Sequence, residues 1–309
     1  HLLLGIIMCG RFTIRTTTRD LARVFQVSGF PEIELPRANI SPTEPVPLIR
    51  AADGKRDRSA EADRRASIVD NEASVDDEAP VGSVARWGLI PHWAEDEKIG
   101  NKLFNARSET VAEKPAFRAS FRSRRCLVPA SAFFEWKRLD EAPSTSRARK
   151  QPYEIAPAPA PVGAGGGSVD QDNGSLGARD PGLLVFAGLW SHWTSPRGEW
   201  IESCTILTTE PTAQLSQLHD RMPVILEPED FDAWLFTPPE RATDLIDLLR
   251  PSTRSLITKP ADPAEFGRSG GAAADRSGGR QSGGLGRDRR GGARRESNGS
   301  SSQRTLFDF

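Results

Sequence analysis

Short apolar runs separated by polar turns recur through much of the chain, and their length is typical of β-strands. Helical signals are fewer: a capped apolar repeat at 18–25, a proline followed by two acids at 228–235, and a third candidate at 242–249. Many strands with few helices predict an α+β fold, a β-rich single domain with a curved sheet or partial barrel. The expected strands are 46–49, 125–129, 183–190, 204–208 and 223–226.

Three stretches have compositions unlike a protein core. Residues 51–83 are charged and lack aromatic residues, 140–182 are rich in Ala, Pro, Gly and Ser, and 264–302 are rich in Gly, Ser and Arg. Such segments bury too little apolar surface to offset chain entropy, so we expect two disordered insertions and a disordered tail. The predicted organisation is a domain at 8–260, a tail at 261–302 and a terminal motif at 303–309.

Charge and cysteine content exclude several classes of protein. The net charge is −1, so a DNA-binding surface would have to come from local clusters of basic residues. The three cysteines are far apart and form no Cys-x-x-Cys pair, which argues against a zinc site or a disulfide framework. We therefore expect no metal, no other cofactor and a reducing, cytoplasmic environment. No apolar stretch is long enough to cross a bilayer.

The chain opens with an apolar segment, residues 1–7, ahead of Met8 and Cys9. This segment lacks the basic region and the small-residue cleavage site of a signal peptide. Because it starts with His1, we interpret it as upstream mistranslation, with Met8 as the true start. The alternative interpretation is a short apolar N-terminal strand.

Cys9 has unusual chemistry if Met8 is removed, because it then carries a free α-amine and a thiol on adjacent carbons. Such a 1,2-aminothiol condenses with an aldehyde to an imine, which closes to a thiazolidine. An unperturbed α-amine has a pKa of about 7.7–8.0, so part of it is neutral and nucleophilic near neutral pH. The alternative is a buried structural cysteine, the commoner role of this residue type.

Five motifs follow one another along the predicted folded part. Together they resemble the SRAP family, whose members trap abasic sites in single-stranded DNA through a cysteine at the mature N-terminus. Each motif alone is weak, but five in order are specific, and they span nearly the whole predicted domain. The motifs are Cys-Gly-Arg-Phe at 9–12, Arg-Ala-Asn-Ile-Ser-Pro at 37–42, Asn-Ala-Arg-Ser-Glu at 105–109, the segment from Arg-Cys-Leu-Val-Pro to Phe-Phe-Glu-Trp at 125–136, and Leu-His-Asp-Arg-Met-Pro-Val at 218–224.

The resemblance implies four catalytic residues. Cys9 matches the nucleophile, Asn105 the residue that hydrogen-bonds the trapped sugar, Glu135 the acid beside the N-terminal amine, and His219 the residue that acts on the sugar ring. These residue types suit the chemistry, because an abasic sugar is mostly a closed hemiacetal and its opening needs an acid–base group. Glu135 lies between two aromatic residues, which favours a raised pKa.

Further motif positions imply binding of single-stranded DNA carrying abasic sites, by a protein that we expect to be a monomer. Arginine suits phosphate because its planar group donates two hydrogen bonds, and aromatic rings stack on bases of any sequence. The implied contacts are Arg11 and Arg107 to phosphates, Asn39 and Pro42 in a nearby loop, and Trp93 and Trp136 as aromatics.

Taken singly, these residues also have structural explanations. Asn105 is compatible with a turn, Arg107 with a surface charge, Glu135 with the solvated side of a strand and His219 with the core. The remaining cysteines and several tryptophans lie in apolar runs, where we expect core or strand-face positions for Cys126, Cys204, Trp190, Trp193 and Trp200.

The C-terminus resembles the motif by which proteins bind a sliding clamp. Gln303 is followed three residues on by Leu306 and three further by Phe309. Such a segment forms one helical turn whose apolar side chains fill a hydrophobic pocket. Chance is the alternative, since the motif is short.

Three functions remain open at this point. The first is a covalent trap for abasic sites, with weak lyase activity if the imine persists. The second is a self-processing thiol peptidase in which Cys9, His219 and Glu135 form a nucleophile, base and orienter. The third is a non-covalent DNA-binding adaptor, for which Cys9→Ala would leave DNA retention unchanged.

Overall fold

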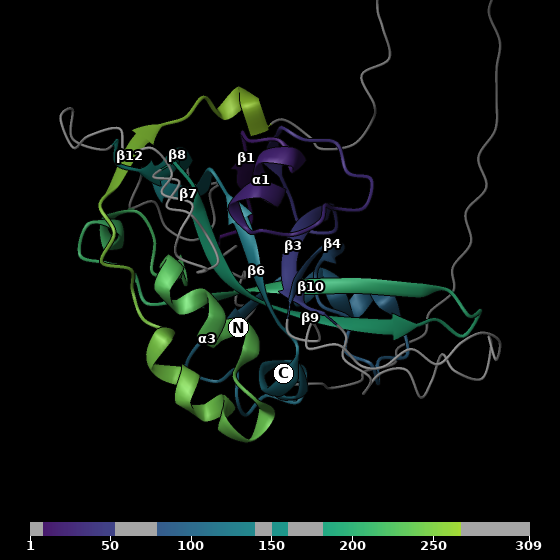
Figure 1. The fold of residues 1–309 in the computed structure, drawn as a ribbon. Coiled ribbons are helices and arrows are strands. Elements are labelled where there is room, and N and C mark those ends of the chain that lie inside the picture. Colours follow the sequence, from purple (N-terminus) through teal and green to yellow (C-terminus); the bar gives the residue numbers. More distant parts are fainter. Residues whose placement is uncertain (1–8, 53–78, 140–149, 160–181, 267–309) are drawn as a thin grey trace, which may run out of the picture. The chain divides into compact units, whose positions relative to one another are not determined.

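The computed structural model describes residues 9–52, 79–139, 150–159 and 182–266, which form two β-sheets with short helices around them (Figure 1). The strands are β1 (Phe12–Ile14), β2 (Arg37–Ile40), β3 (Pro45–Ala51), β4 (Pro80–Trp87), β5 (Asn105–Arg107), β6 (Arg125–Ala130), β7 (Ala132–Arg138), β8 (Lys150–Pro157), β9 (Leu184–Thr194), β10 (Trp200–Thr209), β11 (Met222–Pro223) and β12 (Leu256–Pro260). The α-helices are α1 (Thr18–Val24), α2 (Arg118–Ser123) and α3 (Phe231–Phe236). The 3-10 helices are η1 (Glu97–Lys102), η2 (Leu215–Gln217), η3 (Pro228–Asp230), η4 (Pro239–Leu248) and η5 (Pro263–Phe266).

The larger sheet closes on itself. Its strand order is β11-β10-β4-β3-β6-β9, and β9 also pairs with β10, so that β10, β4, β3, β6 and β9 form a ring. Within the ring only the β10–β4 pairing is parallel. The predicted β-rich α+β fold is confirmed, and the expected partial barrel is a closed one. Strand β5 pairs with β10 beside the ring and places Asn105 opposite Ile206.

The second sheet has the order β12-β8-β7-β1-β2. Short β1 lies between β7 and β2, with Phe12 opposite Phe133 of β7. The chain passes from the barrel into this sheet at Ser131, whose backbone N–H donates to the carbonyl of Thr13 (2.7 Å). Cys9, three residues before the start of β1, is thereby brought next to β7.

Aromatic side chains fill the core between the barrel and β1. The Phe12 ring makes edge-on contacts with Trp87 (5.0 Å between centroids) and Phe186 (6.1 Å), and Phe133 contacts Phe186 (6.0 Å). All four side chains are buried. Burying each contributes roughly 1.5–3 kcal/mol, and this packing fixes the position of β1 and of the cysteine before it.

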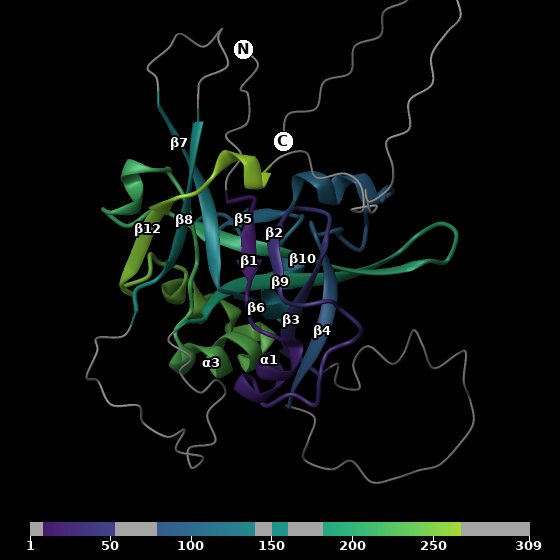
Figure 2. The ribbon, with the colours of Figure 1, turned by 90° about the horizontal axis from the view of Figure 1, so that it is seen from above.

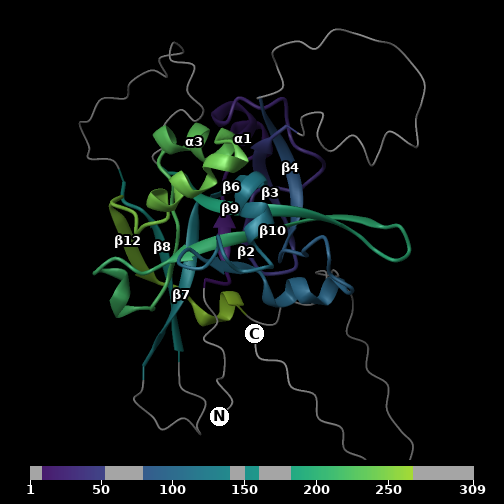
Figure 3. The same ribbon diagram turned by 90° about the horizontal axis from the view of Figure 1, so that it is seen from below.

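A second core forms where helices cover the barrel. Phe25, after α1, packs on Phe231 of α3 (5.9 Å), and Phe121 of α2 packs near Trp234 of α3 (6.2 Å). The end of α1 therefore contacts the start of α3, and the views from above and below show both helices on the same side of strands β9 and β10 (Figures 2 and 3). As predicted, the thiols of Cys126 and Cys204 are buried. They lie in the first of these two cores, the one that contains Phe12 of β1.

The prediction of disorder is wrong for three segments. Strand β8 lies inside the expected insertion at 140–182, β4 begins inside the one at 51–83, and η5 lies inside the expected tail. Strand β8 pairs with β7 on one side and with β12 on the other, and its ladder with β12 begins only at Tyr153, so Pro152, which has no N–H, lies just outside that ladder. The sequence around β8 is rich in Ala and Pro, so composition alone does not predict this strand.

Smaller differences occur near the C-terminal end of the domain. The expected strand at 223–226 is reduced to Met222–Pro223 and one bridge between Ile225 and Phe186. The expected helix at 228–235 begins as η3 and continues as α3, and the helix at 242–249 falls within η4, which is 3-10 rather than α-helical.

Buried Arg125 ties the barrel to the helices. Its guanidinium donates to the carbonyls of Phe121 (2.9 Å), Arg122 (2.7 Å) and Trp234 (2.5 Å), and to that of Thr237. Burial lowers its pKa to about 10.

We expect Arg125→Met to lower the free energy of unfolding by about 3–5 kcal/mol, because several buried carbonyls lose their donors. Urea denaturation measures this, with exposed Arg122→Met as the matched control; equal stability of the two variants would contradict the prediction.

Candidate active site

Cys9 lies at the junction of three strands that are far apart in sequence. It is buried, with 2% of its surface exposed. Its backbone N–H donates to Oε1 of Glu135 on β7 (3.0 Å), and its carbonyl accepts from Nδ2 of Asn105 on β5 (3.1 Å). In this chain the Cys9 nitrogen is a peptide amide; if residues 1–8 were removed, the same position would hold an α-amine.

Glu135 is an almost fully buried carboxyl group, with 2% of its surface exposed. Burial raises its pKa well above the usual range, and the charge of Asp220 adds to this, while the Cys9 N–H opposes it. The direction agrees with the expectation from its aromatic neighbours. The alternative of a solvated strand position is therefore wrong. Its second oxygen, Oε2, has no hydrogen-bond partner among the described residues.

His219 faces this oxygen from the loop between η2 and β11. Its Nε2 is 3.9 Å from Oε2 of Glu135, and within the described part of the chain Nε2 makes no hydrogen bond either. On the other side of the ring, Nδ1 accepts from the backbone N–H of Arg221 (3.1 Å) and lies 3.1 Å from a carboxylate oxygen of Asp220. Burial lowers the pKa of His219. The raised pKa of Glu135 and the lowered pKa of His219 both favour neutral groups over an ion pair.

The Cys9 thiol is also held in its neutral form. Burial raises its pKa well above the usual value, and the charge of Glu135 and a hydrogen bond with it raise it further. A thiol peptidase needs a thiolate, which positive surroundings normally stabilise. The raised pKa of the thiol therefore does not favour a thiolate at this site.

The four predicted catalytic residues are brought together from four separate parts of the chain, and their roles remain predictions.

Among the predicted DNA contacts, Arg11 donates to Oδ1 of Asn39 (2.5 Å), and Arg107 is exposed at the end of β5. Trp136 is partly buried beside Glu135 and packs on Phe266. The remaining two lie in loops: Pro42 is partly buried, and Trp93 has 50% of its surface exposed.

Several site residues escaped the sequence-based prediction. Arg221 donates to both carboxylate oxygens of Glu109 (2.5 and 2.9 Å) and to the carbonyl of Thr208 (2.6 Å), which fixes the loop that carries His219. The motif at 218–224 contains Asp220 and Arg221, but the resemblance assigns a role to its histidine alone. The predicted clamp-binding residues Gln303, Leu306 and Phe309 lie outside the described residues.

In the described part of the chain, no group of three or more His, Cys, Asp or Glu side chains is arranged to hold a metal ion. No helix there is long and apolar enough to span a membrane.

The fold is a closed β-barrel joined to a second sheet. Cys9, Asn105, Glu135 and His219 come together where the barrel and the second sheet meet, and they form a buried site that contains a thiol. The family model described as SOS response associated peptidase (SRAP) matches residues 8–263. The chain belongs to this family, as its motifs indicated.

Similar proteins are found in bacteria and vertebrates. Abasic site processing protein YoqW of Bacillus subtilis is 36% identical over 230 residues, which cover 74% of this chain and 80% of YoqW. Abasic site processing protein HMCES of Xenopus tropicalis is 32% identical over 160 residues, 51% of this chain and 44% of HMCES. A solved structure from Bacteroides thetaiotaomicron aligns with a TM-score of 0.60 at 21% identity, covering 84% of this chain and 95% of that one, and shows the shared fold.

Proposed function

We propose that this protein processes abasic sites in single-stranded DNA by forming a covalent thiazolidine between Cys9 and the ring-opened sugar. The observation that carries the proposal is the position of the Cys9 nitrogen, 3.0 Å from a buried carboxyl group of raised pKa. Names of the relatives, abasic site processing proteins, agree with this substrate.

Ring opening comes first in the proposed reaction. The hemiacetal loses the proton of its C1′ hydroxyl and gains one on the ring oxygen as the C1′–O4′ bond breaks. The two unpaired atoms, Nε2 of His219 and Oε2 of Glu135, are 3.9 Å apart, too far for a direct hydrogen bond. A sugar oxygen beside this pair, off the line that joins the two atoms, would be within reach of both, and Asn105, which already bonds the Cys9 carbonyl, is proposed to hydrogen-bond the sugar.

Condensation follows at the Cys9 nitrogen. The amine adds to the aldehyde carbon, and protonated Glu135 donates its proton to the departing hydroxyl, which leaves as water. The resulting iminium is paired with the Glu135 carboxylate. That carboxylate then takes the thiol proton as sulfur bonds to the same carbon, which closes the neutral thiazolidine and restores the Glu135 acid. A raised pKa suits Glu135 to this role, because an ordinary carboxyl group has no proton to donate near neutral pH.

DNA binding in this proposal relies on Arg11 and Arg107 for the flanking phosphates and on the exposed face of Trp93 for a base. A sliding clamp is a second partner in the proposal, through residues 303–309. Self-processing before Cys9 remains an alternative origin of the free amine, although the raised pKa of the thiol does not favour a peptidase.

The test is the intact mass of the protein before and after incubation with an abasic single-stranded oligonucleotide. We expect the free protein to begin at Cys9 and a denaturation-resistant species to equal protein plus oligonucleotide minus one water. A protein that begins at Cys9 and forms no such species would overturn the proposal in favour of the non-covalent adaptor.

A further inference from the structure

The described chain ends in a turn that packs against the candidate active site. Phe266 of η5 makes edge-on contacts with Phe134 (4.9 Å between centroids, 72°) and Trp136 (5.2 Å, 73°). These residues flank Glu135 on β7, and strand alternation directs Glu135 to the opposite face, toward Cys9. The turn therefore covers the outer face of the strand whose inner face carries the acid.

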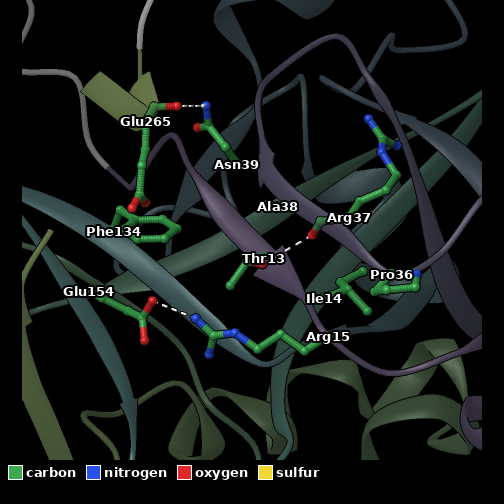
Figure 4. Close-up of a pocket in the computed structure, with 10 residues that line it drawn as sticks. All are labelled: Thr13, Ile14, Arg15, Pro36, Arg37, Ala38, Asn39, Phe134, Glu154 and Glu265. Atoms are coloured by element: carbon green, nitrogen blue, oxygen red, sulfur yellow. Dashed lines mark hydrogen bonds and ion pairs between the residues drawn. The ribbon is translucent and has the colours of Figure 1, made fainter. Parts of the chain in front are cut away.

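A chain of two hydrogen bonds links this turn to Arg11. The backbone carbonyl of Glu265 accepts from Nδ2 of Asn39 (2.9 Å), and Oδ1 of Asn39 accepts from Nη1 of Arg11 (2.5 Å). Figure 4 shows the first of these bonds, with Asn39 and Glu265 on one wall of a groove of about 580 Å³. The Glu265 carbonyl can only accept a hydrogen bond, so the NH2 group of the Asn39 amide must face it. The oxygen of the same amide then faces the guanidinium of Arg11.

Arg11 differs from the neighbouring arginines in its charge balance. Arg15 and Arg37 line the groove, and each is paired with a carboxylate, Glu154 (2.5 Å) and Glu44 (3.1 Å) respectively. Across the described ranges, Arg11 has a neutral amide as its partner and no carboxylate. Among the described residues, no carboxylate therefore neutralises this positive charge, which lies two residues from Cys9.

Asn39 is suited to this intermediate position. Its backbone has a φ of +56°, a left-handed conformation that asparagine adopts more readily than most residues. Its amide offers one donor group and one acceptor group, and the turn and Arg11 use one each. Aspartate at this position would keep the acceptor, lose the donor and neutralise Arg11.

We propose that η5 is a positioning element of the DNA site: Phe266 clamps the turn on β7, and the Glu265 carbonyl, through Asn39, holds Arg11 toward the phosphate beside the trapped sugar. This inference rests on the proposed function and adds the C-terminal turn, as a set of positioning residues, to the machinery of that site.

The test measures the affinity of the full chain for an undamaged single-stranded oligonucleotide at several salt concentrations. The logarithm of the binding constant falls with the logarithm of salt by about 0.7 per phosphate contact on a single strand. Phe266→Ala removes no charge, yet we expect it to reduce this slope by about 0.7 and to weaken binding roughly tenfold at low salt. Asn39→Asp should do the same without disturbing the aromatic packing.

Two further variants make the test specific. In an Arg11→Ala background, Phe266→Ala should change the slope no further, because the contact is already lost. Arg15→Ala removes a charge that Glu154 already neutralises and should keep the wild-type slope. A wild-type slope in both Phe266→Ala and Asn39→Asp would overturn the inference, as would a slope for Arg15→Ala as low as theirs.

Failure of this inference can be told apart from failure of the proposed function. Cross-linking of wild-type protein to the abasic oligonucleotide is measured in the same preparation. Adduct formation with unchanged slopes would refute the positioning role alone. Absence of adduct would refute the covalent trap, while the slopes still decide whether η5 orients Arg11.

Discussion

We expect Cys9→Ser, in a chain that begins at residue 9, to abolish the denaturation-resistant adduct, with a loss of at least about 10³-fold in its rate of formation. Serine keeps the α-amine beside Glu135 but has no thiol to close the ring, so the reaction stops at a reversible imine. Denaturing gel electrophoresis measures the stable adduct. Borohydride added during the reaction reduces the imine and should restore a cross-linked band for the serine variant.

Two controls isolate the amine and the thiol. A chain that retains Met8 has the Cys9 thiol but an acylated nitrogen, and it should form no adduct with or without borohydride. Cys126→Ala removes a thiol that is buried in the core, away from the hydrogen bonds of the site, and should cross-link normally. A stable adduct with the serine variant in the absence of borohydride would show that ring closure by sulfur is not the trapping step.

We expect Glu135→Gln to slow adduct formation by roughly 10²–10⁴-fold, because the amide has no acidic proton to donate to the departing hydroxyl. Glutamine preserves the shape and the acceptor for the Cys9 N–H, so the comparison isolates the proton. The raised pKa predicts that the wild-type rate falls as the pH rises through the folded-state pKa of Glu135. Rates measured across the pH range should show this fall in the wild type and not in the variant.

Stability gives an independent measurement of the same pKa. The folded-state pKa of Glu135 lies above its unfolded value of about 4.3. The carboxyl group therefore binds its proton more tightly in the folded protein than in the unfolded chain. Its contribution to stability is complete below the unfolded pKa and is lost as the pH rises through the folded one. The melting temperature of Glu135→Gln relative to wild type should therefore increase from pH 4 to neutral pH. A constant difference would show that the carboxyl group is not perturbed.

Local sequence determined the types of chemistry and most of the strands. Apolar runs such as 125–129 and 204–208 became β6 and β10, because a strand buried in a sheet needs apolar side chains at adjacent positions. The cysteine with its flanking residues predicted a nucleophile, because that chemistry follows from residue type. The pKa of Glu135 is raised as expected, but the cause is burial on the Cys9 side of β7, since the aromatic residues beside it in sequence lie on the opposite face.

Tertiary structure decided how these residues meet. The Cys9–Glu135 hydrogen bond joins residues 126 positions apart, and it depends on β1 pairing with β7. Strand β8, with proline near its start, is held by partners on both sides, and η5 is held by the aromatic pair on β7 and by Asn39. Composition predicted disorder for both, because a local pattern records how apolar a segment is and carries no information about the distant strands that pair with it.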